Sequence, residues 1–338
     1  MNSAEPNMET KMNPKESQAH SQRFETGYAP LAHRVVVRIS GPGAAKFVQG
    51  QFSQNVDEVI ADQSLRAAAC TPKGRAYCLT RLVRHQDDLL LDLDAALADA
   101  TLTHLRKYLM LFRGTSMELM PDAGIVGLIG QAAAIAVWGE AASSLSRPGQ
   151  TLVSDSGILI RVEDACGQIP RYEWWQLDSQ QSMPAELTEL SPDTWEASSI
   201  AAGVPWLTPE TQEVYVPQML NLQHLQGIHF KKGCYTGQEV IARMHFLGQL
   251  KKSLFRLSFQ GSNTAPAPGT RLMSGDKSVG EVVNAAITGD QTGELLAVIR
   301  HDAQQEALTL DGAEAVTLQM EDLPYPVPEH QPATQADT

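Results

Sequence analysis

One cysteine in the chain stands in a setting that favours a reactive thiolate. Cys234 follows a lysine pair and a glycine in residues 232–241, KGCYTGQEVI, just ahead of a predicted short helix. A nearby ammonium group and a helix N-terminus both stabilise negative charge on sulfur. Gly233 and Gly237 would let the backbone turn sharply around the thiol. The residues alone also allow Cys234 to be a small buried hydrophobic side chain.

The neighbours of Cys234 leave several interpretations open. Lys232 either stabilises the thiolate or holds a loop, and the sequence does not decide between the two. Glu239 and Arg243 lie four residues apart on the predicted helix, a spacing typical of an ion pair. Three histidines flank the motif, and one of them could join Cys234 in transiently holding a metal ion or sulfur: His224, His229 and His245. Isolated histidines are seldom ligands, so we predict no metal site.

Composition indicates a globular protein with a local basic surface. The net charge of −13 argues against indiscriminate binding to nucleic acids or anionic membranes. Residues 224–256 nevertheless contain six Lys or Arg against one acid, so this segment carries +5 and the remainder −18. It is either a solvated face or a surface for a polyanion or an acidic partner.

Cysteine spacing and the absence of a signal sequence predict a cytoplasmic protein. Cys70, Cys78, Cys166 and Cys234 form no CxxC pair, which disfavours a zinc site or a disulfide framework. The first two dozen residues lack the apolar core of a secretory signal. Residues 123–139 carry no charge, but they are too short and too rich in glycine for a membrane span. Two strands, 125–129 and 134–138, are expected there instead.

The periodicity of apolar residues predicts an α+β protein with a β-rich C-terminal part. Expected strands are 35–39, a hairpin of 65–70 and 77–83, 88–92, 157–162 and 172–177. Expected helices are 44–50, 95–111, 140–146, 183–190, 195–203 and 220–227. Short alternating runs after residue 250 predict a small barrel, with strands at 254–260, 279–284 and 295–300. We expect a disordered leader (1–25), two α+β subdomains (26–247), the barrel (248–326) and a tail (327–338).

Five segments together are similar to one protein family. The segment NLQHLQGIHFKKGCYTGQEVIAR (221–243) resembles the cysteine signature of the YgfZ family of folate-binding proteins, relatives of the glycine-cleavage T-protein, an aminomethyltransferase. Shorter matches are GPGAAKFVQGQFSQNV, CTPKGRAY, WEASSIAAGVP and LPYP, which together extend over roughly residues 30–326. The family motif comprises Lys232, Gly233, Cys234, Tyr235, Gly237, Gln238 and Glu239.

The resemblance implies both a fold and a role. It implies a T-protein-like architecture with mixed or antiparallel sheets, a C-terminal β-barrel and a central cavity for tetrahydrofolate or a derivative. It also implies an accessory role in the assembly or repair of iron–sulfur clusters. The clients would be iron–sulfur enzymes, such as the radical enzymes that modify tRNA. Cys234 would be the key thiol, with Lys232 beside it.

Trp195 is the residue that the resemblance assigns to folate, since a flat pterin binds by burial against aromatic rings. Two positions differ from the family pattern. Arg34 stands where some members have tryptophan, and its guanidinium could stack on the ligand or hold its glutamate tail. Ala201 stands where a glutamate often pairs with the pterin donors. Trp195 can also be an ordinary core residue.

The catalytic aspartate of the T-protein has no counterpart at the matching place. The corresponding stretch, residues 77–80, contains no carboxylate. Aminomethyl transfer needs a charged or proton-accepting group near the folate nitrogen, so glycine-cleavage chemistry is disfavoured. Two alternatives to the accessory role stay open: an autonomous one-carbon transferase that uses tetrahydrofolate, and a non-catalytic module that contacts tRNA or protein.

Overall fold

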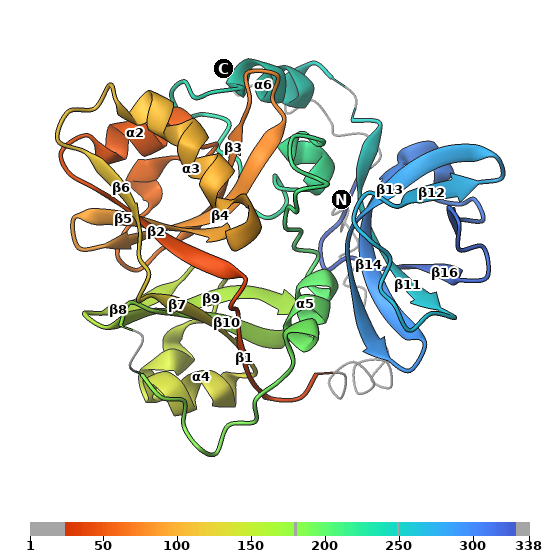
Figure 1. Ribbon diagram of the computed structural model, residues 1–338, viewed down its shortest axis with the longest axis horizontal. Helices are drawn as coiled ribbons and strands as arrows, with labels where there is room; N and C mark the ends of the chain where they lie inside the picture. The colour runs from red at the N-terminus through yellow and green to blue at the C-terminus, as the bar shows by residue number, and fades with distance from the viewer. Residues whose placement is uncertain (1–23, 179–180, 249, 329–338) are drawn as a thin grey trace, which may run out of the picture.

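The computed structural model describes residues 24–178, 181–248 and 250–328, which form three β-sheets with short helices packed against them (Figure 1). Within each sheet, the described strands pair antiparallel. The predicted α+β class is therefore confirmed. The predicted leader and tail lie almost entirely outside the described residues. None of the helices in the described ranges has the length and apolar character needed to cross a membrane.

The first sheet carries two helices on its outer face. Its strands, in spatial order, are β3 (Leu65–Cys70), β4 (Ala76–His85), β5 (Asp88–Asp94), β2 (Arg34–Ser40) and β6 (Ser116–Leu119). The helices are α2 (Ala44–Gln51) and α3 (Ala95–Leu109). Alternation along β5 explains the two-sided burial of this sheet: Leu89 and Leu91 belong to the core beneath the helices, whereas Leu90 belongs to the central core.

The second sheet lies below the first in Figure 1. Its strands, in spatial order, are β1 (Gly27–Pro30), β7 (Gly124–Ile129), β10 (Ile169–Gln176), β9 (Gly157–Ala165) and β8 (Thr151–Ser154). Helix α4 (Gln131–Trp138) and the 3-10 helix η2 (Glu140–Ser144) follow β7. The strand predicted at 134–138 is thus wrong. The alanine-rich run after Gly130 favours a helix. Ala133 and Ala134 are its buried residues, and they belong to a core cluster with side chains of the second sheet.

The third sheet is C-terminal and curls around its own core (Figure 1). Its strands, in spatial order, are β15 (Thr309–Leu310), β12 (Arg271–Ser274), β13 (Lys277–Gly289), β14 (Thr292–Arg300), β11 (Lys252–Gln260) and β16 (Thr317–Glu321). Because β15 and β16 are its two edges, the predicted barrel takes the form of a curled open sheet. A short 3-10 helix, η4 (His301–Ala303), follows β14.

Helix α5 (Pro192–Ala201) lies between the second and third sheets (Figure 1). The Ser191 side chain caps its first turn, and Gly203 follows its end with φ +66°, as the sequence predicts for a helix stopped by glycine. One central core contains Leu90 of the first sheet, Ile160 of the second and Val298 of the third. The three sheets therefore meet around a shared centre.

Two predicted helices are wrong, although the structure describes every residue in both ranges. Residues 183–190 run as turns and extended chain, because backbone groups of Thr188 and Leu190 bond to Tyr28 at the edge of the second sheet. In the range 220–227, Leu220 ends the 3-10 helix η3 (Pro217–Leu220), and residues 221–226 form consecutive turns. Asn221 adopts φ +58° there and donates its side-chain amide to the carbonyl of Leu254, which ends the helical path.

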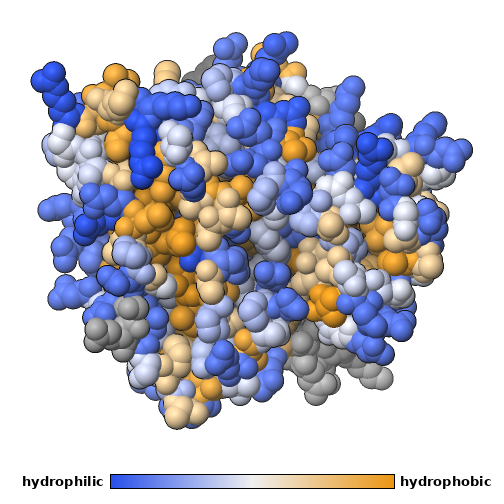
Figure 2. Space-filling model, viewed as in Figure 1, coloured by the Kyte–Doolittle hydropathy of each residue, from blue (hydrophilic) through white to orange (hydrophobic). Residues whose placement is uncertain are grey.

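Two further short elements complete the framework. The 3-10 helix η1 (Val56–Glu58) follows the first helical segment, and α6 (Gln238–Phe246) lies at the top of the molecule in Figure 1. Figure 2 shows apolar side chains gathered on the front face at the left, over the lower part of the first sheet and down to its junction with the second sheet. The front face is therefore least polar near the place where the first two sheets meet.

Candidate functional site

A cavity lies where the first two sheets meet α5 and the segment that follows it. The space between its walls is about 840 Å³, with the solvent of the open mouth included. The polar residues that line it come from both sheets, from α3 and α5, and from the turn before β2: His33, Arg34, Arg66, Thr80, Asp92, Asp94, Thr101, Arg171, Glu173, Glu196 and Ser199. The cavity is therefore rich in both charges.

Arg34, predicted to touch folate, lines this cavity but also ties the first sheet to the second. Its guanidinium bonds to Asp92 of β5, at 3.1 and 2.5 Å, and to Glu173 of β10, at 2.6 and 3.2 Å. Burial alone would lower the pKa of Arg34, but the two carboxylates raise it. Most of its donors are committed to these partners, so Arg34 shapes the cavity wall more than it can clasp a ligand.

Trp195, the other predicted folate residue, lies inside the cavity wall. Its side chain is buried, and the guanidinium carbon of Arg171 lies 4.2 Å from its ring centroid. A Cβ on Gly127 would come within 2.4 Å of the indole, so this glycine lets the ring pack directly on β7. The structure thus brings Trp195 and Arg34 to one cavity, with much of the indole already covered.

Arg171 is a buried cation in the same wall. Among the described residues, its guanidinium donates to the Ser199 hydroxyl at 2.5 Å and to the Glu163 carbonyl at 3.2 Å, and pairs with no carboxylate within 4 Å. Burial lowers its pKa to about 9. A buried guanidinium without a close counter-ion stabilises a ligand that brings negative charge or carbonyl oxygens.

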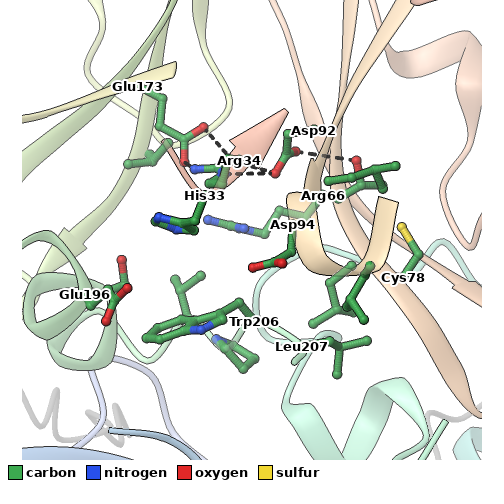
Figure 3. A pocket seen from close by; sticks show the side chains of 18 of the residues that line it. His33, Arg34, Arg66, Cys78, Asp92, Asp94, Glu173, Glu196, Trp206 and Leu207 are labelled. Carbon is green, nitrogen blue, oxygen red and sulfur yellow. Dashed lines mark hydrogen bonds and ion pairs between the residues drawn. The ribbon is translucent and has the colours of Figure 1, made fainter. Parts of the chain in front are cut away.

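Two residues that the sequence analysis did not select complete the cavity. Glu196, next to Trp195 on α5, has its pKa raised to about 7 by burial first, then by Asp193 and Asp94. Trp206 is only partly buried, and its backbone bonds to the side chain of Asn284 on β13, at 3.1 Å in each direction. Figure 3 shows Glu196 and Trp206 bordering the open space on the side away from Arg34.

The sequence contained a signal for both Glu196 and Trp206. Glu196 lies five residues before Ala201, the position where the resemblance led us to look for a glutamate. Trp206 directly follows the AGVP turn. The stretch 77–80, which lacks the T-protein carboxylate, does reach the cavity, because Cys78 and Thr80 line it. The carboxylates of the cavity come instead from β5, β10 and α5.

The cysteine motif lies elsewhere. None of the residues 232–239, all of which the structure describes, lines this cavity. Cys234 is exposed, Tyr235 is buried, and Gly237 adopts φ +84° as the N-cap of α6. The prediction of a helix just beyond the cysteine is confirmed. The interpretation of Cys234 as a buried hydrophobic residue is wrong.

Lys232 anchors this loop. Its ammonium group donates three hydrogen bonds of 2.7 Å, to the carbonyls of Gln49, Phe52 and Gln54, at and beyond the C-terminus of α2. It also lies 4.9 Å from the ring centroid of Tyr235. Because an ammonium has three hydrogens, none remains to donate to the Cys234 sulfur. Of the two roles open for Lys232, the structure favours the loop anchor.

A second motif packs against the first. A Cβ on Gly237 would meet the Thr71 carbonyl at 2.6 Å, and one on Gly74 would meet Val240 at 2.8 Å. These close approaches join the β3–β4 turn to the start of α6, although the two are about 165 residues apart. The exposed side chains on this joined surface are Lys73, Arg75, Lys231, Cys234, Glu239 and Arg243.

The three histidines near the motif are each engaged by another side chain. His229 lies 2.9 Å from a Glu58 carboxylate oxygen, His224 stacks on Tyr325, and His245 stacks on Phe230. Within the described ranges, no group of three or more His, Cys, Asp or Glu side chains could hold a metal ion. A histidine partner for Cys234 gains no support from this geometry.

The fold and the central cavity define a class of protein. The fold is that of glycine-cleavage aminomethyltransferases, as seen in the crystal structure of aminomethyltransferase T from Bartonella henselae. The TM-score is 0.68 at 14% identity, over 91% of this chain and 88% of that one. The T-protein-like architecture expected from the sequence is therefore confirmed.

Sequence relatives narrow the class to a family. The tRNA-modifying protein YgfZ of Klebsiella pneumoniae is 32% identical over 336 residues, which cover 92% of this chain and 97% of the relative. YgfZ of Colwellia psychrerythraea is 31% identical over 245 residues, with 71% of this chain and 74% of the relative covered. A scan of protein-family models found no match. The chain belongs to the YgfZ family.

Proposed function

We propose that this protein binds tetrahydrofolate or a derivative in the central cavity. The observation that carries the proposal is the combination, in one cavity, of a partly exposed indole, a carboxyl group with a pKa near neutrality and a buried guanidinium. A pterin is flat, with N–H donors on one edge and a carbonyl oxygen nearby. Trp206 would stack on the ring, Glu196 would accept from its donors, and Arg171 would face its oxygen.

Calorimetric titration with tetrahydrofolate tests this assignment. We expect binding to the wild type and a loss of about fivefold or more for Trp206→Ala, since stacking on one ring contributes about 1–3 kcal/mol. Trp195→Ala distinguishes a wall residue from a stacking residue, because its loss should reduce protein stability as well as affinity. Absence of heat for the folded wild type would refute folate binding.

The proposed role is accessory. The relatives are named tRNA-modifying proteins, and the family resemblance connects that activity to the assembly or repair of iron–sulfur clusters. Cys234 would contribute the working thiol, because it is exposed on a loop that Lys232 holds rigidly. In a strain that lacks the wild-type copy, Cys234→Ala should depress the activity of iron–sulfur enzymes that modify tRNA. Full activity with this variant would remove the thiol from the mechanism.

An autonomous one-carbon transferase is the alternative that the cavity keeps open. Asp92 is occupied by Arg34 and by the backbone N–H of Arg81, and Asp94 caps α3 through the N–H of Ala96. Among the described residues, the Glu196 carboxyl accepts no hydrogen bond and would be the available base. Incubation with tetrahydrofolate and one-carbon donors should give no turnover if the role is purely accessory.

Direct contact with tRNA is a second candidate, supported by the surface around Cys234. The packing of the β3–β4 turn on α6 adds Lys73 and Arg75 to the basic residues of segment 224–256. Such binding would weaken steeply with salt. We expect Lys73→Ala/Arg75→Ala to lower retention of tRNA at low ionic strength, with Arg106→Ala and Arg113→Ala, on the far end of α3 and its loop, as matched controls.

A further inference from the structure

A second cavity adjoins the first and shares one residue with it. It contains roughly 1290 Å³ of unoccupied space, mouth included, and lies between β3, β4, the loop before β8 and the C-terminal segment. Arg66 lines both cavities. Arg81 and Arg147 also line the second one, together with Glu163 and Asp164.

The two carboxylates of this cavity are already committed. Glu163 accepts hydrogen bonds of 2.7 and 2.5 Å from Arg66, and the guanidinium of Arg66 and then that of Arg81 hold its pKa low against the effect of burial. Asp164 is ion-paired with Arg161. Glu163 is thus shared between two guanidinium groups, and neither carboxylate pairs with Arg147.

Arg81 is a buried cation of this cavity whose hydrogen bonds are incomplete. Its side chain is 3% exposed, yet it reaches Glu163 only at 3.3 and 3.5 Å and the Ser64 hydroxyl only at 3.4 Å. Its Nε has no hydrogen-bond partner among the described residues. Burial, first, and the neighbouring Arg66 lower its pKa. A buried guanidinium with long, incomplete contacts gains free energy from an anion.

Arg147 adds an exposed cation to the same cavity. It lies in the loop before β8, and within the described parts of the chain its guanidinium has no carboxylate within 4 Å. With Arg66 and Glu163 paired, the cavity offers one buried and one accessible guanidinium to a ligand. Two separated cations suit a ligand with several carboxylates along a flexible chain.

We propose that the second cavity receives the γ-linked glutamate tail of the folate whose pterin ring occupies the first. Arg66, at the boundary of the two cavities, marks where the tail passes, and Arg81 and Arg147 take its carboxylates. The protein would then prefer folates that carry several glutamates over the monoglutamate. This inference rests on the proposed folate function and specifies its substrate class.

Calorimetry with tetrahydrofolate monoglutamate and pentaglutamate tests the proposal on the full chain. We expect the pentaglutamate to bind wild type about tenfold tighter or more, which is the effect of one charge-assisted hydrogen bond. Arg147→Ala should reduce this preference several-fold and leave the affinity for the monoglutamate unchanged. Arg113→Ala, which removes an exposed arginine from another loop, is the matched control and should keep the full preference.

The outcomes separate the two levels of the proposal. Equal affinity for both forms would overturn the tail site while leaving folate binding intact. A preference that survives Arg147→Ala undiminished, and also survives Arg81→Gln in protein with an unaltered circular dichroism spectrum, would overturn it as well. Absence of binding for either form would overturn the folate function itself, and the tail site with it.

Discussion

If the central cavity binds folate as proposed, Glu196 should make that binding depend on pH in a defined direction. Its pKa is raised to about 7 by burial and by the carboxylates of Asp193 and Asp94. The ionised carboxylate is the form that accepts hydrogen bonds from the pterin donors, so binding must remove the proton wherever it is still present. We therefore expect affinity for tetrahydrofolate to rise between pH 6 and pH 8.

The size of the effect follows from the pKa. With a value of about 7, about one Glu196 in ten is ionised at pH 6 and about nine in ten at pH 8. Apparent affinity scales with the competent fraction, so it should increase about ninefold. His33 also lines the cavity, and burial, together with Arg34, lowers its pKa.

Stability of the ligand-free protein should change in the opposite direction. The folded pKa of Glu196 lies above the unfolded value, so its contribution is fully present below about pH 4.5 and is lost as pH rises through about 7. Glu196→Gln keeps the shape and removes the charge change. Titration calorimetry at pH 6, 7 and 8 should show a rising affinity for wild type and a nearly flat one for Glu196→Gln. An equal slope for both proteins would refute the assignment.

Three substitutions test the framework around the two sites by denaturant unfolding. Lys232→Met should lower the free energy of unfolding by about 3 kcal/mol, because three carbonyls lose a charged donor. Lys231→Met, at the exposed neighbour, should lower it by less than about 0.5 kcal/mol. Equal losses for the two variants would refute the role of Lys232 as the loop anchor. Gly127→Ala should cost about 1–3 kcal/mol by collision with Trp195, and less when the indole is also removed; strict additivity would contradict the contact. Cys234→Ala should stay within about 0.5 kcal/mol of wild type, since the thiol is exposed, and a larger loss would mean a structural role.

Local patterns in the sequence predicted much of the fold. The hairpin of β3 and β4 follows from two apolar runs around a Pro-Lys-Gly turn. The end of α5 follows from the glycine after it, although the helix starts at Pro192 and not at the predicted residue 195. The prediction of a strand at 134–138 failed because an uninterrupted apolar run has no periodicity that separates a helix from a strand. The prediction of a helix at 220–227 failed because the side-chain amide of Asn221 donates to the carbonyl of Leu254, a contact that no local pattern reveals.

The candidate site was predictable only in part. Trp195 and Arg34 were placed in the cavity by resemblance, but their partners are distant in sequence: Glu173 lies 139 residues from Arg34. The anchoring role of Lys232 depends on carbonyls 178 to 183 residues away, so the motif could indicate a thiolate or a loop anchor equally well. Burial sets the pKa of Glu196, and burial is a property of the assembled sheets.

The thiol of Cys234 and the two cavities are separate, but one stretch of chain, residues 52–54, contacts the neighbours of both. The stretch 52–54 supports both the thiol loop and the second cavity. The carbonyls of Phe52 and Gln54 accept hydrogen bonds from Lys232. The side chains of Ser53 and Gln54 donate to the carbonyls of Gly227 and Gln226, the latter in the wall of the second cavity. A client that contacts Cys234 would dock on the surface of the motif, which lines neither cavity. Folate and client could therefore be held at once, with this stretch as their shared support.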